Sequence, residues 1–262
     1  ARQCKVGINN TSLPSASLHV KGQGTTSSTA NFFVENSAGN YIARLDDAGT
    51  NIRFGLRSGQ ALTSGTDNIL LGYYTGGLGL TTASNNVLIG RSAGISNNGA
   101  SNVAIGYETL RLGTTVDSSV ALGYHALRAV TGDRNIGIGY AAIGANTTAD
   151  GNVAIGDNSM QVNTTGASNV AVGRNALNAN TTADYNVAVG YNSLVLNTTG
   201  TTNVGVGSFA LGANTTGGSN TSVGYSALDA NTTASHNTAI GRSALGANTT
   251  GHSNVAVGKD AL

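Results

Sequence analysis

Residues 169–185 read NVAVGRNALNANTTADY, and this stretch decides the fold because it recurs along most of the chain. Each copy opens with Asn-[Val/Ile]-[Ala/Gly]-[Val/Ile]-Gly or a close variant, and successive copies begin 16 to 18 residues apart. A fixed short period indicates a solenoid, in which every repeat packs on its neighbours. Twelve copies are found, opening at Asn68, Asn86, Asn102, Ser119, Asn135, Asn152, Asn169, Asn186, Asn203, Asn220, Asn237 and Asn254.

The parts of the unit have separate physical roles. Side chains alternate along a strand, so Val170 and Val172 are expected to point into the coil while Ala171 points outward. Gly173 has a counterpart in every copy, which predicts a corner with positive φ. Leu177 is expected to fill the interior from a second short strand, although Gly residues break its column in the first two copies. The chain is therefore predicted to be an all-β parallel β-solenoid of about twelve 17-residue coils.

Two asparagine positions recur in the unit. The asparagine that opens the strand is expected to form a side-chain amide ladder with its copies in neighbouring coils. The asparagine of the Asn-Thr-Thr turn matches the acceptor pattern for N-glycosylation, but Asn and Thr in a turn also bond local backbone. These sequons begin at Asn146, Asn163, Asn180, Asn197, Asn214, Asn231 and Asn248.

The predicted coil has a thin core, which suggests association with other chains. About three large apolar side chains per coil must offset the cost of ordering each residue, roughly 1–2 kcal/mol. A strand face in water normally carries Thr, Lys or Glu, so small residues expected to point outward suggest close approach of a second chain and an obligate oligomer. This column holds Ala104, Ala121, Gly137, Ala154, Ala171, Ala188, Gly205, Ser222, Ala239 and Ala256.

Composition excludes several other classes of protein. With 38 glycines, one proline and a formal net charge of +1, the chain is neither a long helical bundle nor disordered by charge repulsion. No apolar run approaches about 20 residues, so membrane insertion is not expected, and nucleic-acid binding is not expected without a clustered basic face. Cys4 is the single cysteine and can close no internal disulfide. The start, ARQCKVGINN, shows no signal-peptide pattern, so the chain is interpreted as a mature segment or a fragment.

Residues 1–67 do not follow the period and are predicted to form a strand-rich N-terminal collar module, with residues 68–262 forming the repeat domain. Short strands are expected at about 17–20, 31–36, 40–45 and 51–55, separated by Gly, Ser and Asn turns. Their apolar residues are too few for an independent core. The module is therefore expected to be intertwined among chains.

The strings NVAIGYETL, NVAIGDNSM, NVAVGRNAL, NVAVGYNSL and TSVGYSAL resemble the head repeats of trimeric autotransporter adhesins. This resemblance implies a left-handed parallel β-roll built by three chains. The longer unit, with NTTG or NTTA between motifs, is similar to a variant in bacteriophage tail fibres and related bacterial surface proteins. The resemblance covers about residues 68–262, and residues 1–67 resemble the collar-like module that precedes such repeats in phage fibres. The autotransporter repeats are shorter and lack the Asn-Thr-Thr insert.

The position after the corner glycine is rich in tyrosine and arginine. Stacking turns each repeat position into a column of residues. An aromatic and guanidinium column could bind a host glycan or another receptor, or it could form an inter-chain ladder stabilised by burial and cation–π contact. We expect at least partial burial, because an exposed aromatic column would promote aggregation. The candidate residues are Tyr73, Arg91, Tyr107, Tyr124, Tyr140, Arg174, Tyr191, Tyr225 and Arg242.

A second column, two residues before the strand motif, is acidic. Asp117, Asp133 and Asp150 occupy three adjacent coils, and Arg134 lies next to them. Carboxylates about 4.8 Å apart repel unless a cation or an arginine intervenes. A weak Ca²⁺ site is one interpretation, and a solvated turn whose Asp side chains accept backbone hydrogen bonds is the other.

The sequence predicts no enzymatic activity and no cofactor, because a regular convex rod offers no evident cleft for paired carboxylates. The expected function is a homotrimeric, extracellular fibre segment of a phage tail fibre or a bacterial surface adhesin. It would attach to a host cell-surface glycan or protein receptor with avidity from three chains. An ice-binding β-solenoid is the alternative, since Thr-rich arrays can order water, and a polysaccharide depolymerase spike is a third hypothesis.

Overall fold

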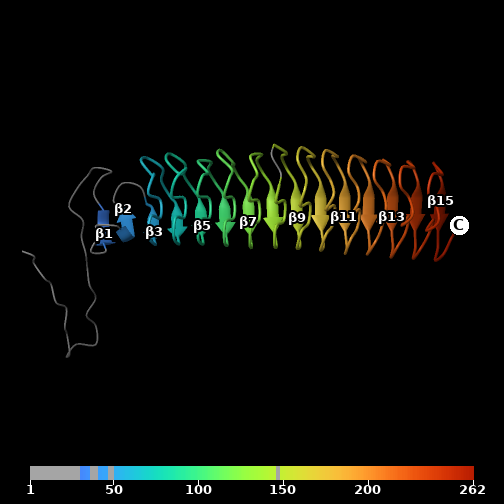
Figure 1. Ribbon diagram of the computed structural model, residues 1–262, viewed down its shortest axis with the longest axis horizontal. Coiled ribbons are helices and arrows are strands. Elements are labelled where there is room, and N and C mark those ends of the chain that lie inside the picture. The colour runs from blue at the N-terminus through green and yellow to red at the C-terminus, as the bar shows by residue number, and fades with distance from the viewer. Residues whose placement is uncertain (1–29, 36–40, 47–49, 146–147) are drawn as a thin grey trace, which may run out of the picture.

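The computed structural model describes residues 30–35, 41–46, 50–145 and 148–262. It is a rod of stacked coils, with the strands of successive coils side by side along its length (Figure 1). This confirms the predicted parallel β-solenoid with a spacing of about 17 residues. The predicted strand at about 17–20 lies outside the described residues.

All fifteen described strands form one sheet whose order follows the sequence. The first two pairings, β1 with β2 and β2 with β3, are antiparallel, and every later pairing is parallel and in register. The strands are β1 (Ala30–Glu35), β2 (Tyr41–Asp46), β3 (Ile52–Phe54), β4 (Ile69–Leu71), β5 (Val87–Ile89), β6 (Val103–Ile105), β7 (Val120–Leu122), β8 (Ile136–Ile138), β9 (Val153–Ile155), β10 (Val170–Val172), β11 (Val187–Val189), β12 (Val204–Val206), β13 (Thr221–Val223), β14 (Thr238–Ile240) and β15 (Val255–Val257).

The parallel ladder begins one coil before the predicted boundary at residue 68. β3 pairs in parallel with β4, and the Asn68 side chain donates to the Asn51 side chain at 2.9 Å, as in the later coils. Gly55 has the positive φ of a corner glycine. Residues 51–55 read NIRFG, and the charged Arg53 at the centre of the strand conceals this copy of the motif.

Each coil contains one strand, and the predicted second strand is absent from all coils of the described residues. The segment that carries Leu177 is a series of turns, with φ of 58° at Asn175 and 49° at Leu177. It still joins the next coil, since the Leu177 amide donates to the Ser193 carbonyl at 3.1 Å. We call this segment, residues 174–180 and its equivalents, the turn face. Left-handed φ values at two of every four residues break the alternation that a strand requires.

The inward and outward residues of the strand are exchanged relative to the prediction. Ala171 and its equivalents are buried, whereas Val170 and Val172 are half-buried on the outer surface. The large side chains of the turn face fill the space beside the strand and leave room there only for a small strand residue: a Cβ added at Gly137 would lie 3.0 Å from the Leu127 side chain. The small column therefore lines the core, and the inference that it approaches a second chain was wrong.

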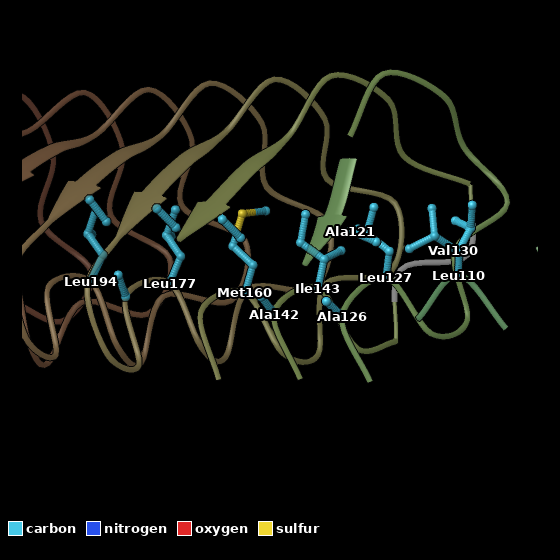
Figure 2. Packing of buried hydrophobic residues seen from close by; sticks show 14 of the residues in the cluster. Leu110, Ala121, Ala126, Leu127, Val130, Ala142, Ile143, Met160, Leu177 and Leu194 are labelled. Carbon is cyan, nitrogen blue, oxygen red and sulfur yellow. The ribbon is translucent and has the colours of Figure 1, made fainter. Parts of the chain in front are cut away.

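Large and small residues are paired across this narrow core. Figure 2 shows the turn-face residues in single file through the coils, among them Leu127, Met160 and Leu177. In the two coils whose inward strand residue is Leu70 or Leu88, the turn face carries Gly instead of Leu. A Cβ added at Gly94 would lie 2.8 Å from the Leu88 side chain. The glycines that break the Leu column thus compensate for leucine on the strand, as close-packed interiors require.

The corner glycine confirms its predicted role and adds a second one. Gly173 has φ of 134°, a conformation that is nearly restricted to glycine. A Cβ there would also lie 2.5 Å from the carbonyl oxygen of Gly190 in the next coil. The glycine therefore permits both the bend and the close stacking of corners.

Asparagine side chains form two buried ladders. In the predicted ladder, the Asn152 side-chain oxygen accepts from both the backbone and the side-chain nitrogen of Asn169, at 2.9 and 3.2 Å. The second ladder runs through the Asn-Thr-Thr turns: the Asn180 side chain donates to Asn163 at 2.7 Å and to the Ala183 carbonyl at 3.0 Å. These amides satisfy backbone groups that the short strands leave unpaired.

Candidate functional site

The tyrosine and arginine column follows the corner glycines along one edge of the rod. Tyr107, Tyr124 and Tyr140 stack face to face, with ring centroids 5.1 and 5.3 Å apart and interplanar angles of 10° and 1°. The Arg91 guanidinium lies 5.7 Å from the Tyr73 ring and 5.8 Å from the Tyr107 ring. These five side chains form one continuous ladder, because in-register coils repeat at nearly the separation that aromatic rings prefer.

The rest of the column is less regular. Arg174 lies 6.0 Å from the Tyr191 ring, and Arg242 lies 5.9 Å from the Tyr225 ring. Phe209, one position further along its coil, contacts both Tyr191 and Tyr225 edge to face. Its bulk beside Ser208 fills the gap left by the missing tyrosine.

The column is largely open to solvent in the single chain. Tyr124 and Tyr140 are 44% and 51% exposed, whereas Tyr107 is half-buried. The faces of Tyr107 and Tyr124 are occupied by each other, by Arg91 and by Tyr140. Ring edges and hydroxyl groups are therefore what these residues offer to a ligand, together with the outer face of Tyr140.

A charged cluster that sequence reasoning missed lies beside this ladder. The Glu108 carboxylate is approached by the Nε atoms of Arg111 and Arg128, at 3.3 and 3.2 Å, and by Nε2 of His125 at 3.2 Å. Only the Arg128 contact has hydrogen-bond geometry, so the buried Nε of Arg111 and Nε2 of His125 are close to the carboxylate without being aimed at it. The His125 ring packs on Tyr124, with centroids 4.0 Å apart, which joins the cluster to the ladder.

The surroundings of Glu108 favour its ionised form. Burial acts to raise the pKa of this carboxyl group, but the hydrogen bond from Arg128 and the charges of Arg111, Arg128 and His125 outweigh burial and hold the pKa below its ordinary value. Glu108 is therefore a carboxylate at neutral pH that fixes two guanidinium groups.

The sequence does contain a signal for this cluster, in the residues one and four positions after Tyr107 and Tyr124. Glu108 and His125 occupy the same repeat position in adjacent coils, and so do Arg111 and Arg128. The positions lie outside any linear motif, and only the stacking of coils brings side chains that are 17 to 20 residues apart together.

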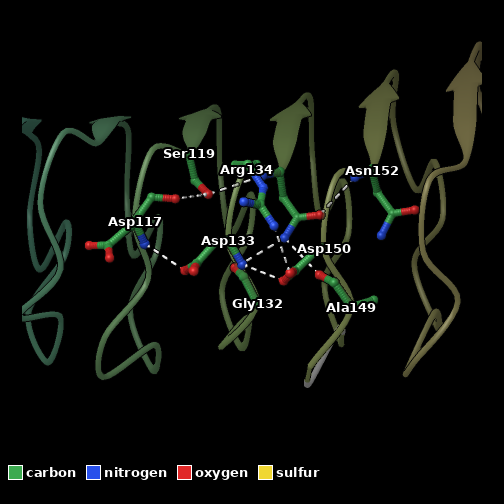
Figure 3. A network of polar contacts seen from close by, with 9 residues as sticks. Asp117, Ser119, Gly132, Asp133, Arg134, Ala149, Asp150 and Asn152 are labelled. Atoms are coloured by element: carbon green, nitrogen blue, oxygen red, sulfur yellow. Dashed lines mark hydrogen bonds and ion pairs between the residues drawn. The ribbon is translucent and has the colours of Figure 1, made fainter.

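The acidic column is occupied by backbone hydrogen bonds. Figure 3 shows Asp117, Asp133 and Asp150 in successive coils. Each carboxylate accepts the backbone N–H two residues before the motif of the previous coil: Asp133 accepts from Asp117 at 2.9 Å, and Asp150 accepts from Asp133 at 2.8 Å. The Arg134 guanidinium also pairs with Asp150 at 3.0 Å.

Other acceptors perform the same role elsewhere in that column. The Ser235 hydroxyl accepts from Gly218 at 3.0 Å, and Nδ1 of His252 accepts from Ser235 at 2.9 Å. Where the position carries an acceptor, a hydroxyl or an imidazole nitrogen can therefore replace the carboxylate. Within the described part of the chain, no three His, Cys, Asp or Glu residues gather in a way that could hold a metal ion.

No family model, curated protein or solved structure matches this chain. Among the described residues, no helix is long and apolar enough to cross a membrane. The architecture and the surfaces of the rod are therefore the basis for a functional proposal.

Proposed function

We propose that the chain is a structural and adhesive fibre segment, homotrimeric, of a phage tail fibre or a bacterial surface adhesin. The observation that carries this proposal is an apolar strip on the outer face of the sheet. Its two columns are the first and third residues of β4 to β15, such as Val170 and Val172, and only Thr221 and Thr238 interrupt them. Several members, including Ile105 and Ile240, are more than a third exposed.

The regular geometry of this strip, more than its area, favours contact with other chains. A three-residue strand is about 10 Å long, and twelve strands at about 4.8 Å make a strip of roughly 550 Å². This matches the largest apolar patch of a typical monomer, about 300–600 Å², and is of the order of one side of a standard interface, about 800 Å². A regular, straight strip is best covered by the same strip of further copies, because their coils repeat at the same spacing. Three such rods around one axis agree with the resemblance of the repeats to trimeric adhesin heads.

Light scattering during gel filtration tests this proposal. The expected mass is three times the chain mass of 26.1 kDa, and a mass near that of one chain overturns the trimer. Val172→Glu together with Val189→Glu places charge in the strip and should dissociate the assembly. The matched control is Thr182→Glu with Thr199→Glu, at exposed positions of the same two coils, and it should leave the mass unchanged. Adherence of the wild-type rod to candidate host cells then tests the adhesive part.

A further inference from the structure

The cluster around Glu108 leaves two arginine groups available for a ligand. Arg128 donates a hydrogen bond from Nε to the Glu108 carboxylate, and Arg111 forms an ion pair with the same carboxylate at 3.3 Å. Within the described residues, neither guanidinium makes a hydrogen bond through its terminal Nη groups. The side chains of Arg111 and Arg128 are 33% and 36% exposed, so each is partly accessible to solvent.

Glu108 reduces the loss of side-chain conformational entropy that would accompany ligand binding. A free arginine side chain loses rotamer freedom when it binds an anion, and a receptor that is already ordered avoids that loss. The Nη edge of guanidinium matches the two oxygens of a carboxylate or sulfate. Arg111 and Arg128 lie in adjacent coils and share one carboxylate. Their two positive charges and the single negative charge of Glu108 leave the cluster with a net positive charge.

The neighbouring residues suit a sugar. His125 contacts Tyr107 and Tyr124, with ring centroids 5.7 and 4.0 Å apart, and Tyr124 and Tyr140 present edges and hydroxyl groups to solvent. Aromatic ring edges and hydroxyl groups beside two guanidinium groups form a combination that can bind a saccharide with an anionic substituent. In the coils of β9 to β15, the two arginines of the column, Arg174 and Arg242, lack an acidic partner that pairs with them in the described chain.

We propose that Arg111 and Arg128, positioned by Glu108 and flanked by His125 and the tyrosine ladder, bind the carboxylate or sulfate group of an acidic saccharide. This inference specifies the ligand class of the proposed adhesive function and rests on it. The anion would lie between the two Nη edges, and the sugar ring would lie toward Tyr124.

Titration calorimetry with hexagalacturonate, its methyl ester and a sulfated oligosaccharide tests the site. The carboxylate form should bind, and its neutral ester should not. Arg111→Gln with Arg128→Gln should weaken binding at least about tenfold, because both charged hydrogen-bond donors to the anion are lost. Arg174→Gln with Arg242→Gln removes the same charge from the other end of the rod and should leave the affinity unchanged.

Glu108→Gln separates a built site from general charge attraction. The substitution makes the rod more positive, so simple attraction predicts tighter binding, whereas loss of the positioning carboxylate predicts weaker binding. We expect weaker binding with an unchanged circular dichroism spectrum. Equal binding of the methyl ester, equal losses in both double variants, tighter binding by Glu108→Gln, or equal affinity for single-stranded DNA would each overturn the proposal. A trimer that binds no acidic saccharide refutes this inference alone, and a monomer that binds it refutes the trimer alone.

Discussion

Ala171 and Leu177 lie in the same coil, at the positions that Leu88 and Gly94 occupy in theirs, so we expect their sizes to be coupled. Ala171→Leu should destabilise the rod by about 1–3 kcal/mol, because the core has no room for the added carbons. Leu177→Gly alone should also destabilise, by leaving a cavity. The double variant restores the pairing of Leu88 with Gly94 within one coil but keeps Met160 in the preceding coil, where Leu88 has Gly76. Its loss should therefore be smaller than the sum of the single losses, by at least about 0.5 kcal/mol, without returning to zero. Denaturant unfolding of the four proteins measures this coupling, and strictly additive losses would contradict the pairing.

The corner glycines allow conformational strain to be separated from steric contact. Gly173 and Gly258 have similar φ values, 134° and 126°, but a Cβ added at Gly258 meets no atom within 4 Å. Gly258→Ala should therefore cost only the strain of its backbone conformation, about 1–3 kcal/mol. Gly173→Ala should cost more, because the Gly190 carbonyl must also move. Equal shifts of the melting temperature would show that corner stacking is not limiting.

The Asn-Thr-Thr turn is a structural element whose asparagine is inaccessible. Asn180 is fully buried and donates to both Asn163 and Ala183. Asn180→Ala should cost about 1–3 kcal/mol, because buried acceptors lose their donors. Thr182→Ala, at an exposed position of the same turn, should be nearly neutral.

The same burial makes a prediction about modification. When the chain is secreted from a eukaryotic cell, the correctly folded fraction should carry no glycan at Asn163, Asn180, Asn197, Asn214 or Asn231, all fully buried. Mass spectrometry of the folded fraction after tryptic digestion checks this. A glycan on Asn180 in folded protein would show that the ladder opens.

The threonine file that runs along the coils with Asn-Thr-Thr turns bears on ice binding. The hydroxyl of Thr181 donates to the Thr198 carbonyl at 3.1 Å, and its equivalents from Thr164 to Thr232 do the same, so in these turns only the second threonine is exposed. A single file cannot form the two-dimensional array that would order water. We expect no thermal hysteresis and no faceting of ice crystals by the purified protein, and faceted crystals at micromolar concentration would favour the ice-binding alternative.

The stability of the whole rod should depend on pH through Glu108. Its pKa is lower in the folded chain than in the unfolded chain, so the unfolded state binds more protons as the pH falls. The resulting stabilisation is present above the ordinary glutamate pKa of about 4.3 and is lost as the pH falls through the folded value. Melting curves from pH 7 to pH 3 should show a smaller loss for Glu108→Gln than for the wild type. Parallel pH profiles would contradict this role.

Local sequence determined the features that need only repetition and backbone chemistry. The spacing of the motif is enough to predict coils, since in-register stacking lets each copy pair with the next. A glycine present in every copy is enough to predict the corner, and a repeated asparagine is enough to predict the first ladder. The leucine column also follows from the sequence, because a large apolar residue at one position of every coil must be buried somewhere.

Only the tertiary structure decided which way the strand faces. Alternation specifies that Val170 and Val172 share a side opposite Ala171, but it does not specify which side is the interior. The short distance between the strand and the turn face determines which side is the interior. The sequence did carry a signal of this: where the central strand residue is leucine, as at Leu88, the turn face has glycine, as at Gly94, in place of leucine. The same stacking decides that NIRFG is a coil and that Glu108 meets Arg128, because contacts between coils depend on the fold and not on neighbours in the chain.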